Sequence, residues 1–377
     1  MKFIVSRNEI FPKLQLVSKV IPSKSSYPML DNFKFELKGD LLTITGTDLQ
    51  TTIIAYQQVE SPEGEGAIAI EARRLLDILK EFSEQPLIFE IDVETKKVII
   101  YTQTGKYSIG AYDTEEYPEP AEIDENQAKA LTIDGTALFR AINKTIFSTS
   151  NEDMQLVMTG ILFELSNDNL TFVSSDGHKL VRYRRYDFQA QDDTQFILPK
   201  KPAELLRTIL AKYNDTVKIN YTNRNALFNL HNYTIICRLI DGQFPQYEAV
   251  IPIDNPNKLV IDRQQFLNAI RRVSVFANQA SKLVKFDIKE NQVVITAQDI
   301  DFSISAEETL PVSYEGEPMK IGFKSTFITE ILSNLDSDEV RIEMSEPSRA
   351  ALFIPSEKIE EEEDEIMLLM PMMLDEE

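Results

Sequence analysis

LTIDGTALFRAI, residues 131–142, is one of three related stretches in this chain. A step of 128 positions leads back to FIVSRNEIFPKL at residues 3–14 and forward to LVIDRQQFLNAI at residues 259–270. In each stretch two apolar residues alternate, a capping-type residue follows, and apolar residues then recur at helical spacing. The capping-type residues are Ser6, Asp134 and Asp262. The apolar helical pairs are Ile10 and Leu14, Leu138 and Ile142, and Phe266 and Ile270. The pattern predicts, three times, a strand that leads into a capped amphipathic helix.

The spacing of the stretches indicates three domains. A period of 128 residues is longer than a solenoid repeat of about 20 to 50 residues. A chain of 377 residues also exceeds what one hydrophobic core usually supports. Each stretch is followed by several alternating strand patterns and a second helix, which predicts helices laid on one face of antiparallel sheet. We therefore expect an α+β architecture with domains at residues 1–125, 126–254 and 255–377.

The composition is that of a globular protein, with 43% hydrophobic residues. No apolar run approaches the roughly 20 residues that span a bilayer. The N-terminus reaches Arg7 after only three apolar residues, which is short for a secretory signal. These features predict a cytoplasmic protein. Cys237 is the single cysteine, so an internal disulfide is excluded, and its strand-like surroundings predict a buried thiol.

The charge distribution is uneven along the chain. A net charge of −22 argues against nucleic acid, because phosphate contacts need Lys and Arg. The helices, however, are expected at residues 7–20, 71–82, 135–149, 199–213, 263–280 and 322–335, and together they carry +10. The remainder of the chain then carries −32. A solvated helix face would also be rich in lysine. Six jointly positive helices on an acidic body favour one surface that faces a polyanion.

Simple geometry connects this charge to a dimer. Six helices placed side by side at about 10 Å each enclose a bore of only about 10 Å. Duplex DNA is on the order of 20 Å across and would not pass. Twelve helices from two chains enclose a bore of about 30 Å. Three like domains repeated twice close such a ring as a head-to-tail homodimer.

Several local motifs resemble those of the bacterial DNA polymerase III beta subunit, the sliding clamp family. They are MKFIV at the N-terminus, YPML after the first helix, SDGHKL from Ser175, DGQFPQY from Asp241 and MPMML near the C-terminus. The resemblance covers essentially the whole chain. It implies a ring-shaped homodimer, without cofactor or metal, that encircles duplex DNA irrespective of sequence and gives the replicative polymerase its processivity. It also implies nucleoid association and binding of a clamp loader, repair polymerases, ligase and mismatch repair proteins through a groove between domains 2 and 3.

The resemblance assigns residues to that partner-peptide groove. They are Met158, Ser175, Gly177, His178, Lys179, Leu180, Pro245, Val250, Met370, Pro371, Met372 and Leu374. Flexible, polarisable methionines suit a surface that accepts different peptides, although a Met-rich terminal segment is also typical of core filling. Ala249 and Met373 stand where the family commonly has a basic residue, so the peptide preference of this groove is left open.

DNA contact is expected from two sources of evidence. The family pattern indicates Lys24 and Lys201, and charge adds Arg73, Arg140, Lys144, Lys200, Arg271 and Arg272. The dimer contact implied by the family involves Tyr107 and Ile109 of one subunit with Val275 and Phe276 of the other, as an edge-to-edge extension of sheet. Ion pairs are expected there from Arg74 and Lys106 to Glu307 and Glu308. The acidic run 360–365 is expected to be a solvated loop.

A catalytic role is not expected. Asp176 and His178 would suit a hydrolase, but the chain has only two histidines and lacks a phosphate loop or a nucleophile elbow. Asp48, Asp176 and Asp299 fall at corresponding points of the three repeats, which favours a turn role. Two alternatives remain open at this point: a hydrolase that uses Asp176 and His178, and an acidic three-domain adaptor that binds proteins but no DNA.

Overall fold

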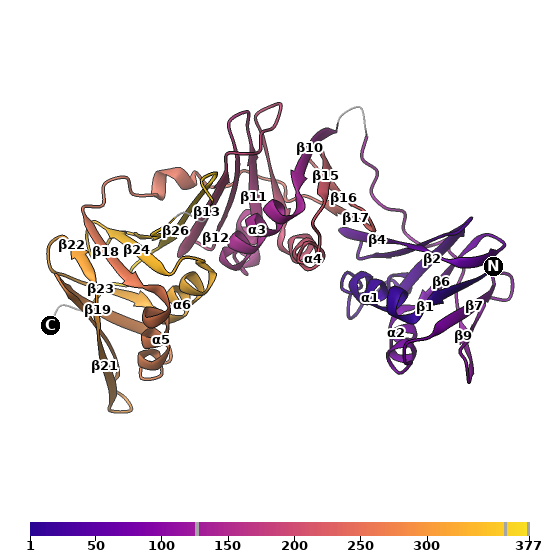
Figure 1. Cartoon of the computed structure of the whole chain (residues 1–377), viewed down its shortest axis with the longest axis horizontal. Helices are drawn as coiled ribbons and strands as arrows, with labels where there is room; N and C mark the ends of the chain where they lie inside the picture. Colours follow the sequence, from indigo (N-terminus) through magenta and orange to yellow (C-terminus); the bar gives the residue numbers. More distant parts are fainter. Residues whose placement is uncertain (125–127, 358–359, 375–377) are drawn as a thin grey trace. The chain divides into compact units, whose positions relative to one another are not determined.

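The computed structural model describes residues 1–124, 128–357 and 360–374 (Figure 1). The chain divides into two compact units, residues 1–138 with 204–239 and residues 139–203 with 240–377. Each unit combines segments from two of the expected repeats. The expected boundary at residue 125 lies outside the described residues.

The first unit contains two sheets. Its strands are β1 (Lys2–Ser6), β2 (Asn32–Lys38), β3 (Leu41–Thr47), β4 (Thr51–Gln58), β5 (Glu60–Glu63), β6 (Gly66–Glu71), β7 (Pro86–Asp92), β8 (Lys97–Tyr101), β9 (Lys106–Gly110), β10 (Lys129–Asp134), β15 (Thr216–Tyr221), β16 (Asn225–Leu230) and β17 (Tyr233–Arg238). One sheet has the order β5-β1-β7-β8-β9, and the other has the order β10-β15-β16-β17-β4-β3-β2-β6. The helices are α1 (Arg7–Val17) and α2 (Ala72–Lys80), with a short 3-10 helix at Pro28–Asp31.

The second unit also contains two sheets. Its strands are β11 (Gly160–Leu165), β12 (Leu170–Ser175), β13 (Lys179–Arg185), β14 (Thr194–Pro199), β18 (Asn257–Asp262), β19 (Leu283–Lys289), β20 (Gln292–Asp299), β21 (Ile304–Pro311), β22 (Ser313–Glu315), β23 (Met319–Lys324), β24 (Glu339–Met344), β25 (Ala351–Pro355) and β26 (Glu363–Leu369). The sheet orders are β14-β11-β12-β13-β26-β25-β24-β18-β22 and β21-β20-β19-β23.

Helices cover these sheets. In the second unit they are α5 (Arg263–Ser274) and α6 (Ser325–Asn334), with 3-10 helices at Ile146–Ser148, Asp153–Thr159 and Tyr247–Val250. Helices α3 (Gly135–Thr145) and α4 (Lys200–Leu210) each pass from one unit to the other. Among the described residues, no helix is both long enough and apolar enough to cross a membrane.

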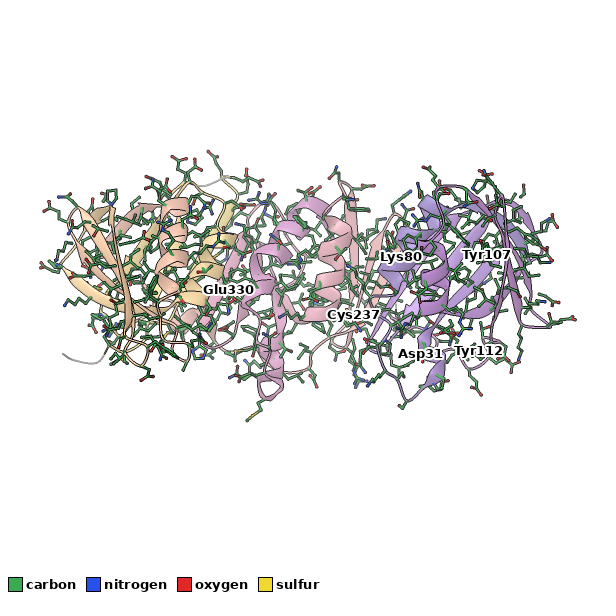
Figure 2. The ribbon with its side chains drawn as sticks, turned by 90° about the horizontal axis from the view of Figure 1, so that it is seen from below. Asp31, Lys80, Tyr107, Tyr112, Cys237 and Glu330 are labelled. Atoms are coloured by element: carbon green, nitrogen blue, oxygen red, sulfur yellow. The ribbon has the colours of Figure 1, made fainter. Side chains whose placement is uncertain are left out.

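The threefold strand-to-helix pattern is confirmed. Ser6 caps α1 by accepting a hydrogen bond from Asn8 N, and Asp262 caps α5 by accepting one from Gln265 N. Asp134 accepts from the backbone of the first turn of α3. The six apolar residues at helical spacing are all buried, at 2% exposure or less. Each copy therefore fixes one helix against its sheet through the same two positions. Cys237 is buried in β17 as expected (Figure 2), and burial raises the pKa of its thiol to about 12.

Two strand pairs join the sheets of successive repeats. Strand β4 pairs with β17, and β13 pairs with β26, both antiparallel. By its order in the chain and its place in the sheet, β21 is the strand of the third repeat that corresponds to β4 and β13. In the same way, β9 is the strand of the first repeat that corresponds to β17 and β26. Within the part of the chain that is described, β9 and β21 are edge strands. Exposed edges of this kind are available for pairing with another chain.

Candidate peptide-binding and DNA-contact sites

The β12–β13 turn holds five of the expected peptide-site residues in a fixed conformation. The Asp176 carboxylate accepts hydrogen bonds from the N–H groups of His178 and Lys179, each at 2.9 Å. Gly177 adopts φ +84°, a conformation that favours glycine. The Ser175 hydroxyl accepts from Gly177 N at 3.1 Å and donates to Lys179 O at 3.0 Å. Asp48 makes the same pair of backbone contacts in the first repeat, which fits the turn role predicted for these aspartates.

Side chains from this turn rest on α6. The His178 ring stacks on Phe327 at 5.7 Å between ring centroids. The Lys179 ammonium lies 4.5 Å from the Phe327 ring centroid and 3.1 Å from a Glu330 carboxylate oxygen. Lys324 approaches the same ring at 4.6 Å. Lys179 is buried, so its charge serves this contact between the second and third repeats rather than a ligand in solvent.

The C-terminal segment continues from β26 past the β12–β13 turn and strand β23. Met370 N donates to His178 O at 2.9 Å, and Met372 N donates to Gly322 O at 2.8 Å. Gly322 permits this approach, because a Cβ there would lie 2.6 Å from a methyl carbon of Leu374. The segment from Met370 to Leu374 is therefore held by backbone contacts to β23 and to the β12–β13 turn. Met370 and Met373 are exposed, at 42% and 80%, whereas Pro371, Met372 and Leu374 are half-buried.

A second apolar cluster lies on one face of β13 and β26. In β13 and β26, Val181 and Met367 belong to the core that also contains residues of α5 and α6, whereas Leu180 and Leu368 point to the opposite face. That opposite face is covered by a cluster of Leu162, Val173, Leu180, Ile197, Phe244, Tyr247, Ala350, Leu352 and Leu368. Met158 packs against it and is half-buried. Val250, at 56% exposure, and Pro245 are exposed beside the cluster residues Phe244 and Tyr247. All twelve expected peptide-site residues thus belong to one unit.

Three residues at this site were missed by sequence reasoning. Phe327, Glu330 and Gly322 belong to α6 and β23, which lie about 150 residues from the Ser175–Leu180 turn in sequence. No local pattern connects them to that turn. They could have been found only by predicting that the second and third repeats pack against each other at this turn.

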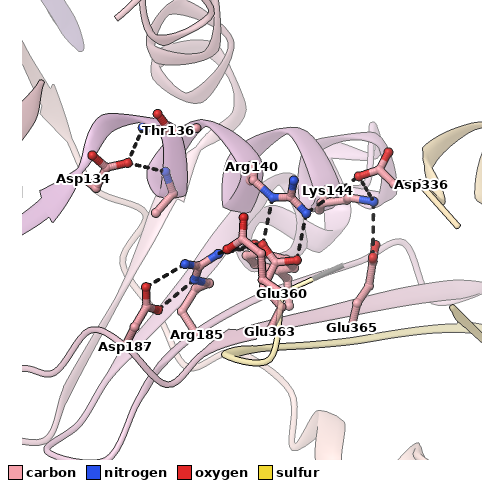
Figure 3. A network of polar contacts seen from close by, with 12 residues as sticks. Asp134, Thr136, Arg140, Lys144, Arg185, Asp187, Asp336, Glu360, Glu363 and Glu365 are labelled. Atoms are coloured by element: carbon pink, nitrogen blue, oxygen red, sulfur yellow. Dashed lines mark hydrogen bonds and ion pairs between the residues drawn. The ribbon is translucent and has the colours of Figure 1, made fainter. Parts of the chain in front are cut away.

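Two residues expected to contact DNA instead form ion pairs within the chain: Lys144 is buried, which contradicts the expectation, and Arg140 is half-buried with 22% of its side chain exposed. Lys144 is 3% exposed, and its ammonium donates to Asn334 O at 2.6 Å. It also lies 2.9 Å from Asp336 and 3.2 Å from Glu365 (Figure 3). Arg140 makes a bidentate pair with Glu363 at 2.8 and 2.7 Å. Neither side chain is available to a phosphate, because acidic partners remote in sequence neutralise it.

Glu363 is the centre of this network. Besides Arg140, it accepts a hydrogen bond from Arg185 at 2.6 Å and one from the Tyr183 hydroxyl. Arg185 is itself paired with Asp187 and Glu360 (Figure 3). The acidic run was expected to be a solvated loop, and this was wrong for its second half. Glu363 and Glu365 are buried in β26, where they face the cations of α3 and β13.

Burial raises the pKa of Glu365 to about 7, and the nearby Lys144 opposes that shift. The ionised carboxylate is therefore less favourable in the fold than in the unfolded chain. The folded pKa lies above the ordinary glutamate value of 4.5, so the stability that this group contributes is greatest below that pH and is lost as the pH rises through about 7. Lys144 retains Asn334 and Asp336 as partners when Glu365 is protonated.

The remaining basic residues differ in their surroundings. Lys24, Arg73 and Arg271 are exposed. Lys200 and Lys201 are half-buried at the start of α4, where the Lys200 ammonium contacts Asn151 at 2.8 Å. Arg272 is 61% exposed but makes a bidentate contact with Glu308 at 2.7 and 2.6 Å. Arg272 and Glu308 had been assigned to different surfaces, DNA contact and dimer contact, and they pair within one subunit.

The residues expected at the dimer contact fall near β9 and after α5. Tyr107 is 38% exposed and packs against Phe82 with the two rings tilted and their centroids 4.9 Å apart, whereas Ile109 is buried. A pocket beside them is lined by Glu71, Arg73, Arg74, Asp77, Ile78, Glu81, Phe82 and Tyr107. Val275 and Phe276 are exposed at 73% and 37%. Arg74 contacts Glu71 at 3.2 Å within its own helix end.

Comparison with known proteins resolves the identity of the family. Models for the N-terminal, central and C-terminal domains of the DNA polymerase III beta subunit match residues 1–121, 132–246 and 248–372 in turn. The chain belongs to the DNA polymerase III beta subunit family. It is similar to the beta sliding clamp of Haemophilus influenzae, with 29% identity over 99% of this chain and 100% of that protein. It is 27% identical to the clamp of Pseudomonas putida at the same coverage.

Solved structures agree with this assignment. The Pseudomonas aeruginosa sliding clamp bound to griselimycin has a TM-score of 0.93 at 26% identity, covering 99% of this chain and 100% of that one. The Bartonella birtlesii clamp bound to griselimycin has a TM-score of 0.92 at 26% identity and the same coverage. As a member of the beta subunit family, the chain is a non-catalytic processivity subunit that acts as a homodimer on DNA with the replicative polymerase.

Proposed function

We propose that two copies of this clamp subunit close a ring through β9 of one copy and β21 of the other. The observation that carries this proposal is the pair of strand junctions within the chain. Strands β4 and β17, and strands β13 and β26, already join successive repeats, and the one remaining pair of counterpart strands lacks a partner in the single described chain. Pairing these edges between subunits repeats the same junction a third time and removes both exposed edges.

The helices support the same arrangement. At the first junction Lys19, just after α1, contacts Thr208 on α4 at 3.3 Å. At the second, Lys144 on α3 contacts Asn334 at the end of α6. The counterpart at the third junction is the end of α5 against α2 of the partner subunit. Phe276 follows α5, and the pocket beside α2 offers Ile78, Phe82 and Tyr107 to receive an aromatic ring.

Replacing Phe276 by aspartate is expected to convert the dimer to monomer at micromolar concentration, because it removes the aromatic ring that would pack on Ile78, Phe82 and Tyr107 of the partner subunit. The measurement is particle mass by analytical ultracentrifugation. Ile253→Asp, at a position that is 99% exposed, is the matched control and should remain dimeric. A dimer that persists unchanged in Phe276→Asp would remove this pocket from the interface.

We propose that the exposed edge of the second apolar cluster is the partner-peptide site. Val250, Pro245 and the Met370–Leu374 segment supply its apolar contacts, and His178 lies beside them on a turn fixed by Asp176. Ser175, Lys179 and Leu180 are buried, so they support the site and do not contact the peptide directly. Methionine side chains repack readily, which suits a site that accepts the polymerase, the clamp loader and repair proteins in turn.

We propose a smaller DNA-contact set than the sequence suggested. Lys24, Arg73, Lys200, Lys201 and Arg271 remain in it. Lys144 leaves it because it is buried in ion pairs, and Arg140 leaves it because Glu363 holds its half-buried guanidinium in a bidentate pair. Arg272 leaves it because it is the third-repeat counterpart of Lys144 and is engaged by Glu308. A few weak contacts to phosphate suit sliding, since they neither read bases nor hold the ring in place. The corresponding cellular location is the cytoplasm, at the nucleoid.

The domain organisation proposed for this chain is 1–125, 126–254 and 255–377. Three strand-to-helix units and two internal junctions support it. The division of the structure into two units follows from those junctions, since each large sheet joins strands of two neighbouring repeats.

A further inference from the structure

We propose that the tip of the β20–β21 hairpin, residues 300–303, is a contact for the second subunit. It reaches the segment that leaves β9, residues 111–113, where it meets Tyr112 of the partner subunit. This inference rests on the ring closure proposed above and adds a contact beyond the paired strands and the Phe276 pocket.

The hairpin of the third repeat is longer than its two counterparts. Gly46 pairs with Ile53 and Ser174 pairs with Val181, so six residues lie between the partners in each case. The corresponding pair in the third repeat is Ala297 with Ala306, separated by eight residues. The two additional residues extend the tip, and Figure 1 shows the end of β21 projecting beyond the rest of its sheet.

The extended tip is apolar and exposed. Ile300 is 80% exposed and Phe302 is 72% exposed. Ile304, the first residue of β21, is 40% exposed on the same side of the strand as the half-buried Ala306. Large apolar side chains gathered in one place mark an interaction surface rather than a solvated turn.

The two junctions within the chain give the register of the third. Ile53 lies opposite Ile235 in the first junction, and Val181 lies opposite Met367 in the second. Ala306 occupies the same position in its strand pair in the third repeat as Ile53 and Val181 do in the first two repeats. Tyr107 occupies the same position in its strand pair in the first repeat as Ile235 and Met367 do in the other two. The same register therefore places Ala306 opposite Tyr107 of the partner subunit.

This register is chemically complementary along the strands. It places Glu307 opposite Lys106 of the partner subunit, an opposite-charge cross-strand pair. It places Ile304 opposite Ile109 of the partner subunit, so that two apolar residues meet on the face covered by helices. A slip of one residue would set these apolar residues against polar ones on the other face.

Continuing the register beyond Ile304 leads the tip to Tyr112 of the partner subunit. In the single chain Tyr112 is 54% exposed (Figure 2). Its backbone is fixed nonetheless, because its N–H and C=O exchange hydrogen bonds with Ala69 at 2.8 and 2.9 Å. An exposed aromatic ring on a fixed backbone is suited to receive Phe302 and Ile300 at little entropic cost.

The register is tested by disulfide cross-linking of the full chain. Ser108 and Ser305 become opposite residues of a hydrogen-bonded pair with Cα atoms about 5.5 Å apart, within the range a disulfide spans. Ser108→Cys with Ser305→Cys should give a covalent dimer on oxidation. Ser108→Cys combined with Ser303→Cys or with Glu307→Cys, each shifted by two residues, should not. The native Cys237 is buried and gives no background.

The tip contact is tested in the same dimer. Ile300→Ser with Phe302→Ser should raise the dimer dissociation constant about tenfold or more, and adding Tyr112→Ser should have little further effect, because both changes remove one contact. Ile253→Ser is the control for loss of an exposed apolar residue. An unchanged dissociation constant in the tip variant, with the Ser108–Ser305 cross-link intact, would overturn the tip contact while leaving the ring. Cross-linking only in a shifted pair would overturn the register, and a monomeric parent protein would overturn the ring itself.

Discussion

Replacing Glu363 by glutamine should lower the free energy of unfolding by about 3–5 kcal/mol, the usual cost of breaking a buried ion pair from one side. The substitution keeps the shape of the side chain but removes the charge shared by Arg140 and Arg185, and it replaces one of the two accepting oxygens by an NH₂ donor that faces guanidinium N–H groups. Two partly buried guanidinium groups would then lack their common carboxylate. The appropriate measurement is amide hydrogen exchange of β13 and β26, which reports the opening of this part of the fold directly.

The same acidic run provides a matched control. Glu362 precedes Glu363 and is exposed, so Glu362→Gln should change stability by no more than about 0.5 kcal/mol. If both variants lose the same amount, the network contributes nothing specific. The acidic run would then affect stability only through its net charge. That is the behaviour of the solvated loop that was expected from the sequence.

Removal of residues 370–377 should abolish stimulation of the replicative polymerase and weaken binding of partner peptides by about 100-fold or more. The deletion takes away Met370, Pro371, Met372 and Leu374 together with the backbone contacts to His178 and Gly322. Dimerisation should be spared, because the proposed interface involves β9 and β21, which this segment does not form. Processive synthesis on a long primed template and peptide affinity by fluorescence anisotropy are the two readouts.

A shorter deletion separates the peptide site from the chain end itself. Removing only residues 375–377 keeps the contacts of Met370 and Met372 and should leave both readouts close to those of the full chain. Polymerase stimulation that survives the longer deletion would show that the partner-peptide site lies elsewhere.

The strand-to-helix units were predictable because their signal is local. Period-two and helical spacing, together with a capping residue, lie within twelve residues of each other, and the side chains of Leu138 and Ile142 are buried as that spacing requires. Repetition of the same signal three times gave the architecture. The family resemblance relied on equally short motifs.

The expected DNA contacts of Arg140 and Lys144 could not be judged from sequence, because the residues that decide them are not local. The charge of a helix can be counted from sequence, but its neutralisation depends on residues that fold against it. Glu363 and Glu365 lie more than 200 positions away and face α3 only because β26 pairs with β13. The alternation of buried and half-buried residues at the start of β26 was hidden in the sequence by a continuous run of acids.

The peptide site was partly predictable for a related reason. The residues in the Ser175–Leu180 turn and the C-terminal segment carry recognisable motifs, whereas Phe327 and Glu330 are ordinary residues of an amphipathic helix. Their role follows from the contact of α6 with the β12–β13 turn. Non-local packing of this kind becomes visible only in the folded chain.

Two subunits are expected to enclose DNA in a ring that slides without reading sequence. The most direct test of this ring is retention on DNA after a clamp loader has acted on nicked circular molecules. The protein should stay on closed circles through gel filtration and should be lost within minutes once a restriction enzyme linearises them. Equal retention on circular and linear DNA would show binding to the surface of the duplex, and no retention on either would favour an adaptor that binds proteins alone.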